Sequence, residues 1–206
     1  MAPPRYTDLE TLHTHVWDDI EAAAEDSGHP YRQITFGTVH ENAPDLRTVI
    51  LRTADADERV LQFHSDRRSR KVTALRDNDR IAWHAWDPDA LEQIRLYGRA
   101  TVHLDDDVAM ALWESQSPSS LTVFTRPSAP GTPLSTPDDG LREAVKEEPI
   151  TEDDVAPGRQ HFAAIRTVID RLEWLHLHPG GHYRAQFEYK DGEEGEDGYE
   201  ATWLVP

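Results

Sequence analysis

The chain has 206 residues, which is enough for one domain of ordinary size with a hydrophobic core, or for two small ones. Its 39 acidic residues outnumber its 21 basic ones, and the formal net charge of −18 disfavours general nucleic-acid binding, because phosphate backbones repel an acidic surface. The absence of cysteine excludes disulfides, thiolate zinc sites, iron–sulfur clusters and cysteine nucleophiles.

The sequence also predicts where the protein is located. It has no run of eighteen apolar residues, so we expect no membrane-spanning helix. Its first residues, MAPPRYTDLE, lack the basic and apolar regions of a secretory signal, so we expect a cytoplasmic protein. Abundant Asp and Glu with scarce Lys suggest, as a hypothesis, adaptation to high salt, where ions screen the repulsion between carboxylates.

The first predicted element is a helix over residues 7–25. Thr7 or Asp8 can cap its start, and the residues SGHP at 27–30 are typical of a helix end. Apolar residues recur along it at helical spacing, namely Leu9, Leu12, Val16 and Ile20.

Strands dominate the following region. Residues 31–39 form the first candidate, and residues 46–53 and 59–65 flank the turn ADADE in a hairpin pattern. A short helix over 67–76 follows, for which Ser65 or Asp66 is the expected cap. Further strands at 81–86 and 91–104 lead into a helix that begins at 105–107 and continues through Trp113.

The composition changes at about residue 115. Residues 115–140 are rich in Pro, Ser and Thr and predict a loop, and residues 138–154 are strongly acidic. Residues 161–178 then predict two strands separated by a bend, RAQFEY a further strand, 191–197 an exposed acidic tip, and YEATWLVP the last strand.

This order of elements predicts a fold class. The elements do not alternate as βαβα, so a parallel doubly wound sheet is not expected. We predict a mainly β fold, a closed antiparallel β-barrel with peripheral helices. We expect a single domain over 1–206, with a Pro-rich and acidic insertion at about 115–155.

The stretch HSDRRSRK, residues 64–71, gathers positive charge where a strand is followed by a helix. The first turn of a helix exposes free N–H groups and a positive dipole end, so cations there are unfavourable unless an anion binds. Arg and Lys are suited to phosphate, and we interpret the stretch as a phosphate pocket. The alternative is that these residues are solvated or paired with carboxylates of the chain.

Two predicted strands add candidate ligand contacts. In LRTVILRT, Arg47 shares a strand face with Val49 and Leu51, and an Arg on an apolar face usually has an anionic partner. Gln93 and Arg95 share a face of the strand 91–104. Together with the basic stretch, these residues suit a ligand with a phosphate and a planar polar ring.

These motifs resemble a known family. RTVILR at 47–52, FHSDRRSRK at 63–71 and EQIRLYGRA at 92–100 together resemble the pyridoxamine 5′-phosphate oxidase-like family. TRPSAPGTPL at 125–134, LEWLHL with HYRAQF within 172–187 and the final strand ending in Pro206 are similar to an oxidase-like subfamily rather than to the vitamin B6 enzyme. The resemblance implies an FMN-binding split barrel, a homodimer with FMN at the subunit interface, and an FMN-dependent oxidoreductase.

The resemblance also implies roles for individual residues. Arg47 would meet the FMN phosphate, while Thr48, Val49 and Leu51 would flank the flavin. Arg70 and Lys71 would hold the phosphate, with Ser65 nearby. Gln93 would hydrogen-bond the ring, and Arg184 would close the flavin site. We name no catalytic acid or base, because the cofactor accepts the hydride.

Several alternatives stay open at this point. The stretch GGHYRAQ does not reproduce the substrate-binding pattern of the B6 enzyme, so the substrate is unassigned. The chain could instead be a non-catalytic FMN carrier or sensor, or could bind another phosphorylated ligand such as pyridoxal phosphate.

The histidines were considered as metal ligands. The i,i+2 pairs His13 with His15 and His176 with His178 could ligate a metal if they lay on strands, with His182 as a further ligand. We expect ordinary surface histidines and no metal, because no carboxylate lies at a recognised ligand spacing.

Overall fold

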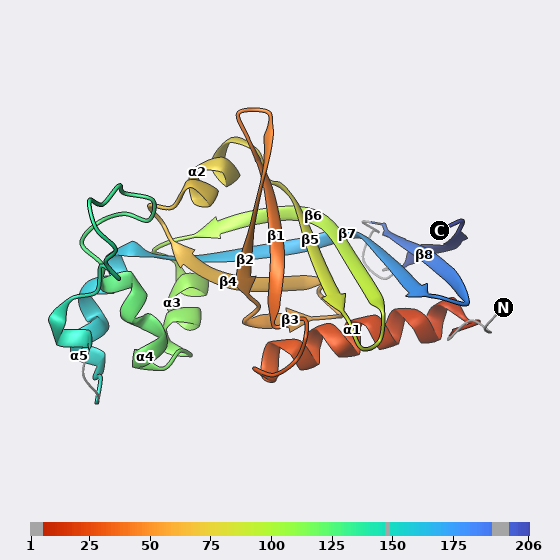
Figure 1. Ribbon diagram of the computed structural model, residues 1–206, viewed down its shortest axis with the longest axis horizontal. Helices are drawn as coiled ribbons and strands as arrows, with labels where there is room; N and C mark the ends of the chain where they lie inside the picture. The colour runs from red at the N-terminus through yellow and green to blue at the C-terminus, as the bar shows by residue number, and fades with distance from the viewer. Residues whose placement is uncertain (1–5, 147–148, 191–197) are drawn as a thin grey trace. The chain divides into compact units, whose positions relative to one another are not determined.

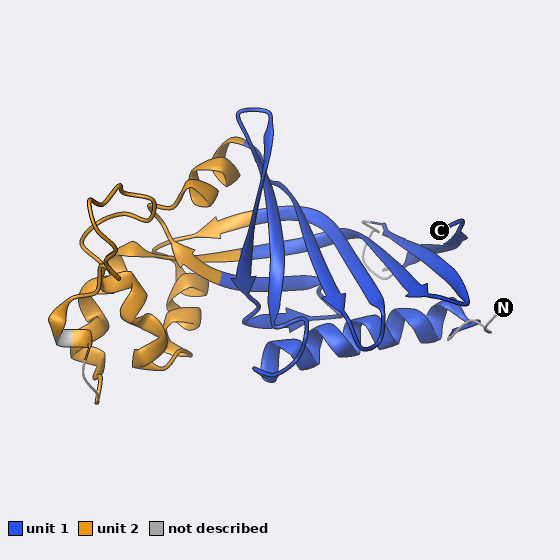
Figure 2. Ribbon diagram, in the orientation of Figure 1, with its two compact units in different colours: residues 1–63, 78–100, 166–206 blue, residues 64–77, 101–165 orange. Residues whose placement is uncertain are grey.

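The computed structural model describes residues 6–146, 149–190 and 198–206. The chain divides into two compact units, which Figure 2 shows in different colours. Unit 1 consists of residues 1–63, 78–100 and 166–206, and unit 2 of residues 64–77 and 101–165. The predicted acidic tip at 191–197 lies outside the described residues.

Runs of strands are separated by helices along the chain, and all the helices after α1 are short (Figure 1). The helices are α1 (Leu9–Glu25), α2 (Arg70–Asp77), α3 (Asp107–Glu114), α4 (Pro118–Leu121) and α5 (Glu152–Val155), with 3-10 helices η1 (Thr122–Thr125), η2 (Glu143–Val145) and η3 (Ala156–His161). The strands are β1 (Gln33–His40), β2 (Ala43–Ile50), β3 (Thr53–Asp55), β4 (Val60–Asp66), β5 (Arg80–Asp87), β6 (Glu92–His103), β7 (Phe162–His178), β8 (Gly181–Tyr189) and β9 (Tyr199–Leu204).

The strands form one sheet in the order β2-β1-β5-β6-β7-β4-β3, with β8 pairing with both β7 and β9. The β1–β2, β1–β5, β3–β4, β5–β6, β7–β8 and β8–β9 pairs are antiparallel. The prediction of a mainly β, antiparallel fold with a few helices is therefore confirmed. That the whole chain is one domain with an insertion stays a prediction.

The hairpin predicted around ADADE is wrong in its pairing. Strand β2 pairs with β1 along its whole length, and only the short β3 pairs with β4. The β1–β2 turn is Glu41 and Asn42, with φ angles of 51° and 62°, as in two-residue turns that match the twist of a hairpin. This tight turn fixes the register and leaves β2 at the edge of the sheet.

The core of unit 1 joins α1 to the sheet. Helix α1 begins as predicted, because the side chain of Asp8 accepts a hydrogen bond from the Thr11 N–H at 2.7 Å. The helix contacts β3 and β9, and its apolar face is buried. The rings of Phe36, Phe63 and Trp83 have centroids 4.8 to 5.5 Å apart within the core.

Residues 161–178 form one strand, not the two strands with a bend that the sequence predicted. Strand β7 runs without interruption from Phe162 to His178. Asp170 and Arg171 are charged residues at its middle, and each has a partner on another strand. Asp170 pairs with Arg80 of β5, and the guanidinium of Arg171 lies 4.1 Å from the ring centroid of Tyr97 on β6.

Unit 2 contains α2 and the segment predicted as a loop. Its core is formed by apolar residues of the helices and of β7, namely Ala109, Leu112, Leu121, Phe124, Val145, Val155, Phe162 and Ala164. The Pro-rich segment therefore contributes buried side chains and short helices, which an extended loop would not do.

In the described part of the chain, the helices are all too short or too polar to span a membrane. The cytoplasmic location stays a prediction.

Candidate functional site

The start of α2, in unit 2, brings together two hydroxyls and an ammonium group. Lys71 Nζ donates to Ser65 Oγ at 3.1 Å, and the Oγ atoms of Ser65 and Ser69 lie 3.2 Å apart. Both serines are buried, so these hydroxyls are fixed in position before any ligand binds. Ser65 and Lys71 were each expected near a phosphate, but their hydrogen bond was not predicted, and Ser69 was missed although it belongs to the same SRK triplet.

The helix begins later than predicted. It starts at Arg70, and the residues before it form a turn, so Ser65 and Asp66 belong to β4 and do not cap it. The carboxylate of Asp66 accepts the N–H of Arg68 at 2.8 Å instead. Ser69 directly precedes the helix, and its carbonyl accepts a hydrogen bond from the Val72 N–H at 3.0 Å.

Two of the four basic residues in the stretch have structural partners. Arg68 pairs with Asp66 at 2.7 Å and donates to the carbonyls of Arg126 and Pro127 at 3.0 Å. Arg67 pairs with Asp105 at 3.3 Å. For these two arginines the alternative interpretation, pairing with carboxylates of the chain, is correct.

The remaining basic residues fit an anion. Arg70 is exposed and has no side-chain hydrogen bond or ion pair to any part of the chain that the structure describes. The first turn of α2 also offers backbone N–H groups that have no acceptor within the helix. Two hydroxyls, an ammonium, a guanidinium and a helix start are a donor set that fits a phosphate monoester, the anionic group of FMN.

On β2, in unit 1, Arg47 is held by its neighbours. It pairs with Asp45 and donates to Thr38 Oγ1 at 2.9 Å and to the carbonyl of Phe36 at 3.2 Å. A phosphate at Arg47 would therefore compete with Asp45 for the guanidinium. Arg47 still has the fork geometry that binds two phosphate oxygens.

The three apolar or hydroxyl residues predicted beside Arg47 differ in exposure. Thr48 is exposed and Val49 is half-buried, and because they are consecutive in the strand their side chains point to opposite faces of β2. Leu51 is fully buried, and its N–H donates to the carbonyl of Arg32 at 3.0 Å. Its side chain packs in the core of unit 1, so only its backbone carbonyl is available as a contact.

Gln93 lies on the outward-facing side of β6, as the alternation of its neighbours predicted. The inward positions Glu92, Ile94 and Leu96 are buried, and Gln93 is half-buried. Its Oε1 lies 3.2 Å from Nε2 of His84 on β5. A glutamine amide and an imidazole together offer both donors and acceptors to a planar polar ring.

Arg184 of β8 belongs to a cluster that the sequence did not reveal. It donates to Glu173 Oε2 of β7 at 2.6 Å, and Arg95 of β6 pairs with the same oxygen. A third arginine, Arg171, lies 3.7 Å from Glu173 Oε1. Three positive charges thus surround one carboxylate on unit 1.

The electrostatics of this cluster are visible in Glu173. Burial raises its pKa, but the hydrogen bond from Arg184 and the charges of Arg95, Arg184 and Arg171 outweigh that effect, and the pKa lies below its usual value. Glu173 is therefore ionised, and the cluster keeps a net positive charge. The alternation of Arg171 and Glu173 along β7 was the sequence signal that could have revealed this cluster.

The predicted residues thus lie in both units. Unit 2 holds Ser65, Arg70 and Lys71, of which the structure joins Ser65 to Lys71. Unit 1 holds Arg47, Thr48, Val49, Leu51, Gln93 and Arg184. Within unit 1, Glu173 connects Arg184 to Arg95, which lies two residues from Gln93 on the same strand.

Comparisons with known proteins agree with this description. Residues 14–104 match the family described as pyridoxamine 5′-phosphate oxidase, FMN-binding domain. Among curated proteins, none matches the sequence.

Solved structures share the fold. A pyridoxamine 5′-phosphate oxidase-related, FMN binding protein from Nostoc punctiforme PCC 73102 is 20% identical over 100% of both chains, with a TM-score of 0.70. PhzG from Burkholderia lata 383, solved in complex with tetrahydrophenazine-1-carboxylic acid, is 17% identical over 100% of this chain and 98% of its own, with a TM-score of 0.68. A protein related to general stress protein 26 from Clostridium acetobutylicum is 10% identical over 85% of this chain and 94% of its own, with a TM-score of 0.54.

The segment that matches the family includes Arg47, Lys71 and Gln93. The predicted split-barrel fold is confirmed, because two of the solved structures match the chain over its full length. Residues 14–104 thus match the FMN-binding domain of the pyridoxamine 5′-phosphate oxidase family, and the full-length chain shares the fold of a protein related to that family.

Proposed function

We propose that this protein binds FMN and uses it as an oxidoreductase. The observation that supports the proposal most strongly is the donor set at the start of α2, where Ser65 lies within hydrogen-bonding distance of both Ser69 and Lys71. Arg70 adds an exposed guanidinium to the same turn. Charge-assisted hydrogen bonds of this kind are the strongest contacts that a protein makes with a phosphate.

The remaining predicted contacts would hold the rest of the cofactor. Thr48 and Val49 would flank the ring, Gln93 would hydrogen-bond its polar edge, and Arg184 would add positive charge near it. Bound FMN would accept the hydride or the electrons, and the side chains would orient it and set the charge around it.

We also propose that the protein works as a homodimer. Leu46 is 67% exposed and Val39 37% exposed, and the register of β1 with β2 places both on one face of this hairpin. Exposed aliphatic side chains that share a face favour self-association. Light scattering on the eluting protein should give the mass of two chains, and Leu46→Asp should shift it toward one.

A titration with two flavins tests the cofactor assignment. FMN should bind, and riboflavin, which has the same ring but no phosphate, should bind at least about 100-fold more weakly, because it forfeits the contacts at the start of α2. Equal affinity for both flavins would contradict the phosphate site. Tight binding of pyridoxal phosphate with no binding of FMN would favour the alternative ligand.

The oxidoreductase activity needs a separate test, because a carrier would bind FMN equally well. The FMN-loaded protein, kept anaerobic, is mixed with candidate reductants while the absorbance of the flavin is followed. The panel includes pyridoxamine 5′-phosphate, reduced nicotinamides and tetrahydrophenazine-1-carboxylic acid, which PhzG was solved with. Rapid bleaching by one compound supports an enzyme. Bleaching by dithionite alone favours the non-catalytic carrier or sensor.

A further inference from the structure

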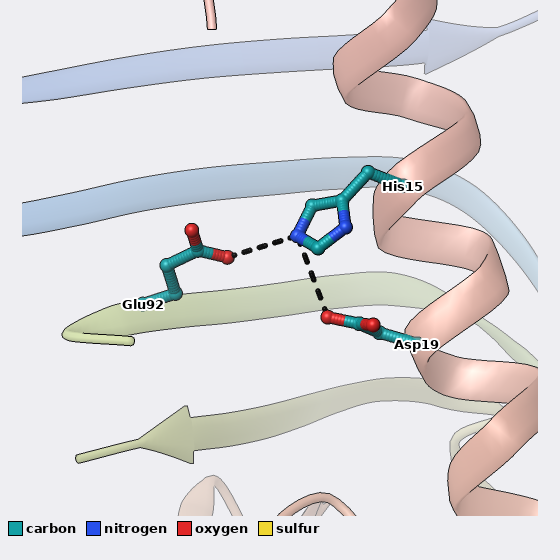
Figure 3. Close-up of side chains that lie close together, drawn as sticks. All are labelled: His15, Asp19 and Glu92. Carbon is teal, nitrogen blue, oxygen red and sulfur yellow. Dashed lines mark hydrogen bonds and ion pairs between the residues drawn. The ribbon is translucent and has the colours of Figure 1, made fainter. Parts of the chain in front are cut away.

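Three side chains of unit 1, from α1 and β6, converge on one point (Figure 3). His15 Nε2 lies 3.3 Å from Glu92 Oε2 and 3.4 Å from Asp19 Oδ2. All three ligand-type atoms lie within 4.8 Å of one another. The cluster is separate from the residues assigned to FMN.

The fold brings the three residues together in a defined way. His15 and Asp19 are four residues apart on α1, so they lie one above the other on the same face of the helix. Glu92 is the first residue of β6 and occupies the inward-facing row with Ile94 and Leu96. The residue before it, Leu91, has a φ of 57°, a left-handed conformation that is costly for leucine.

Burial distinguishes this cluster from surface acidic groups. The side chain of Glu92 is 0% exposed, whereas those of His15 and Asp19 are 22% and 33% exposed. A carboxylate in the core is costly unless positive charge lies close to it.

The donor set and its spacing match a transition-metal site. An imidazole nitrogen and two carboxylate oxygens are common ligands of Zn²⁺, at bond lengths of about 2.0–2.2 Å. In a tetrahedron with bonds of that length, neighbouring ligand atoms are about 3.3–3.6 Å apart, a value that follows from the bond lengths alone. The separations of His15 Nε2 from the two carboxylate oxygens, 3.3 and 3.4 Å, match two edges of such a tetrahedron, and the third edge is within 4.8 Å.

We propose that His15, Asp19 and Glu92 bind one divalent transition-metal ion of the Zn²⁺ class, with a water molecule as the fourth ligand. The ion joins α1 to β6. Its role is structural, since it fixes the N-terminal helix against the sheet of unit 1. The proposal does not depend on FMN binding.

The spacing of the histidines does not reveal this site. It suggests a pair of His13 and His15, but on a helix these two residues point in different directions. His13 contacts Tyr189 at 2.8 Å and stacks on Tyr199, whereas His15 faces the two carboxylates. Glu92 is distant in sequence, and no spacing rule connects it to α1.

Titration of the full-length, chelator-stripped chain with ZnCl₂ alone, by calorimetry, tests the proposal. We expect one ion per chain. Asp19→Asn and His15→Gln should each weaken Zn²⁺ binding by more than about 10- to 100-fold, which is the loss expected when only a hydrogen-bond partner of a ligand is removed. Asp18→Asn, an exposed neighbour on the same helix, should leave binding unchanged. Substitution with Co²⁺ should give visible bands typical of a four-coordinate site.

Thermal unfolding provides a second readout. Saturating Zn²⁺ should raise the Tm of the natural chain and of Asp18→Asn by about 5 °C, because only the folded state offers the site. Asp19→Asn, which is isosteric and partly exposed, should fold normally by circular dichroism but show no such rise. The proposal is wrong if the natural chain does not bind one Zn²⁺ ion with a dissociation constant below about 100 μM. Structural zinc sites bind their ion far more tightly than that. The proposal is also wrong if either ligand variant binds Zn²⁺ as tightly as Asp18→Asn does.

Discussion

At the scale of single residues, the basic stretch 64–71 has two separate tasks. Arg67 and Arg68 hold the strand-to-helix turn by pairing with Asp105 and Asp66. Arg70 and Lys71 extend from the first turn of α2, where the donor set fits a phosphate. The dipole argument alone could not divide the four cations in this way, because it does not consider their partners: Asp66 beside Arg68, and the distant Asp105 for Arg67.

The double variant Arg70→Ala with Lys71→Ala tests the second task. We expect FMN affinity to fall about 100-fold or more, since two charged contacts with the phosphate are lost. The fold should survive, because Arg70 is exposed and Lys71 is half-buried. Lys146→Ala, which removes a lysine that pairs with Glu143 at 2.8 Å, is the matched control and should bind FMN normally. Undiminished affinity in the double variant would defeat the assignment.

Glu173 makes stability depend on pH. Its pKa is lower in the folded state, so its contribution to the free energy of unfolding is complete above the ordinary glutamate pKa of about 4.3 and is lost as pH falls through the lower folded value. Glu173→Gln should cost about 1–3 kcal/mol at pH 7, because three arginines lose their shared carboxylate while solvent screens part of the effect.

The pH profile separates this effect from simple disruption of packing. Denaturant unfolding at about pH 7 and pH 3 should show a smaller difference between Glu173→Gln and the natural chain at the lower pH. Glu188→Gln, an exposed position on the neighbouring strand β8, is the control and should change little at either pH. An equal loss at both pH values would show that the arginine cluster does not set the pKa.

At the scale of elements, the sequence predicted those whose signals are local. The cap at Asp8 and the apolar spacing predicted α1 to within two residues. The pairing of β2 could not be predicted, because it depends on a two-residue turn at Glu41 and Asn42, and ADADE offered an equally plausible turn. The continuity of strand β7 could not be predicted, because its charged middle residues Asp170 and Arg171 have their partners Arg80 and Tyr97 on other strands.

Gly98 shows how closely β6 and β7 approach each other. A Cβ atom at this position would lie 2.0 Å from the backbone oxygen of Val168. Because the obstacle is backbone, it cannot move aside cheaply, and Gly98→Ala should destabilise the protein by about 3 kcal/mol or more. Gly28→Ala is the control, since its nearest neighbour is an Asp26 side-chain oxygen at 3.4 Å. Equal unfolding midpoints in urea for the two variants would contradict the close approach.

At the scale of the whole molecule, the excess of acidic residues should govern the response to salt. The net charge is −18, and screening shortens from about 10 Å at 0.1 M salt to about 3 Å at 1 M. We expect the Tm to be higher in molar KCl than in dilute buffer, because repulsion between carboxylates destabilises the folded chain. A Tm that is no lower in dilute buffer would refute adaptation to high salt.

Much of the candidate site was predictable because its residues lie in short, contiguous motifs. RTVILR, the SRK triplet and EQIRLYGRA hold most of the expected FMN contacts, and the family match covers all three. The arginine cluster around Glu173 and the cluster of His15, Asp19 and Glu92 were not predictable. Each joins residues that are distant in sequence, and only the pairing of strands and the packing of α1 bring them together.

The most direct test of the central claim is the visible absorbance spectrum of the purified protein after incubation with FMN and removal of free flavin by desalting. We predict retained flavin bands, at a ratio close to one FMN per chain, and their loss in the Arg70→Ala, Lys71→Ala variant. A colourless protein after desalting would contradict FMN binding at the start of α2, and the proposed oxidoreductase function would be wrong as well.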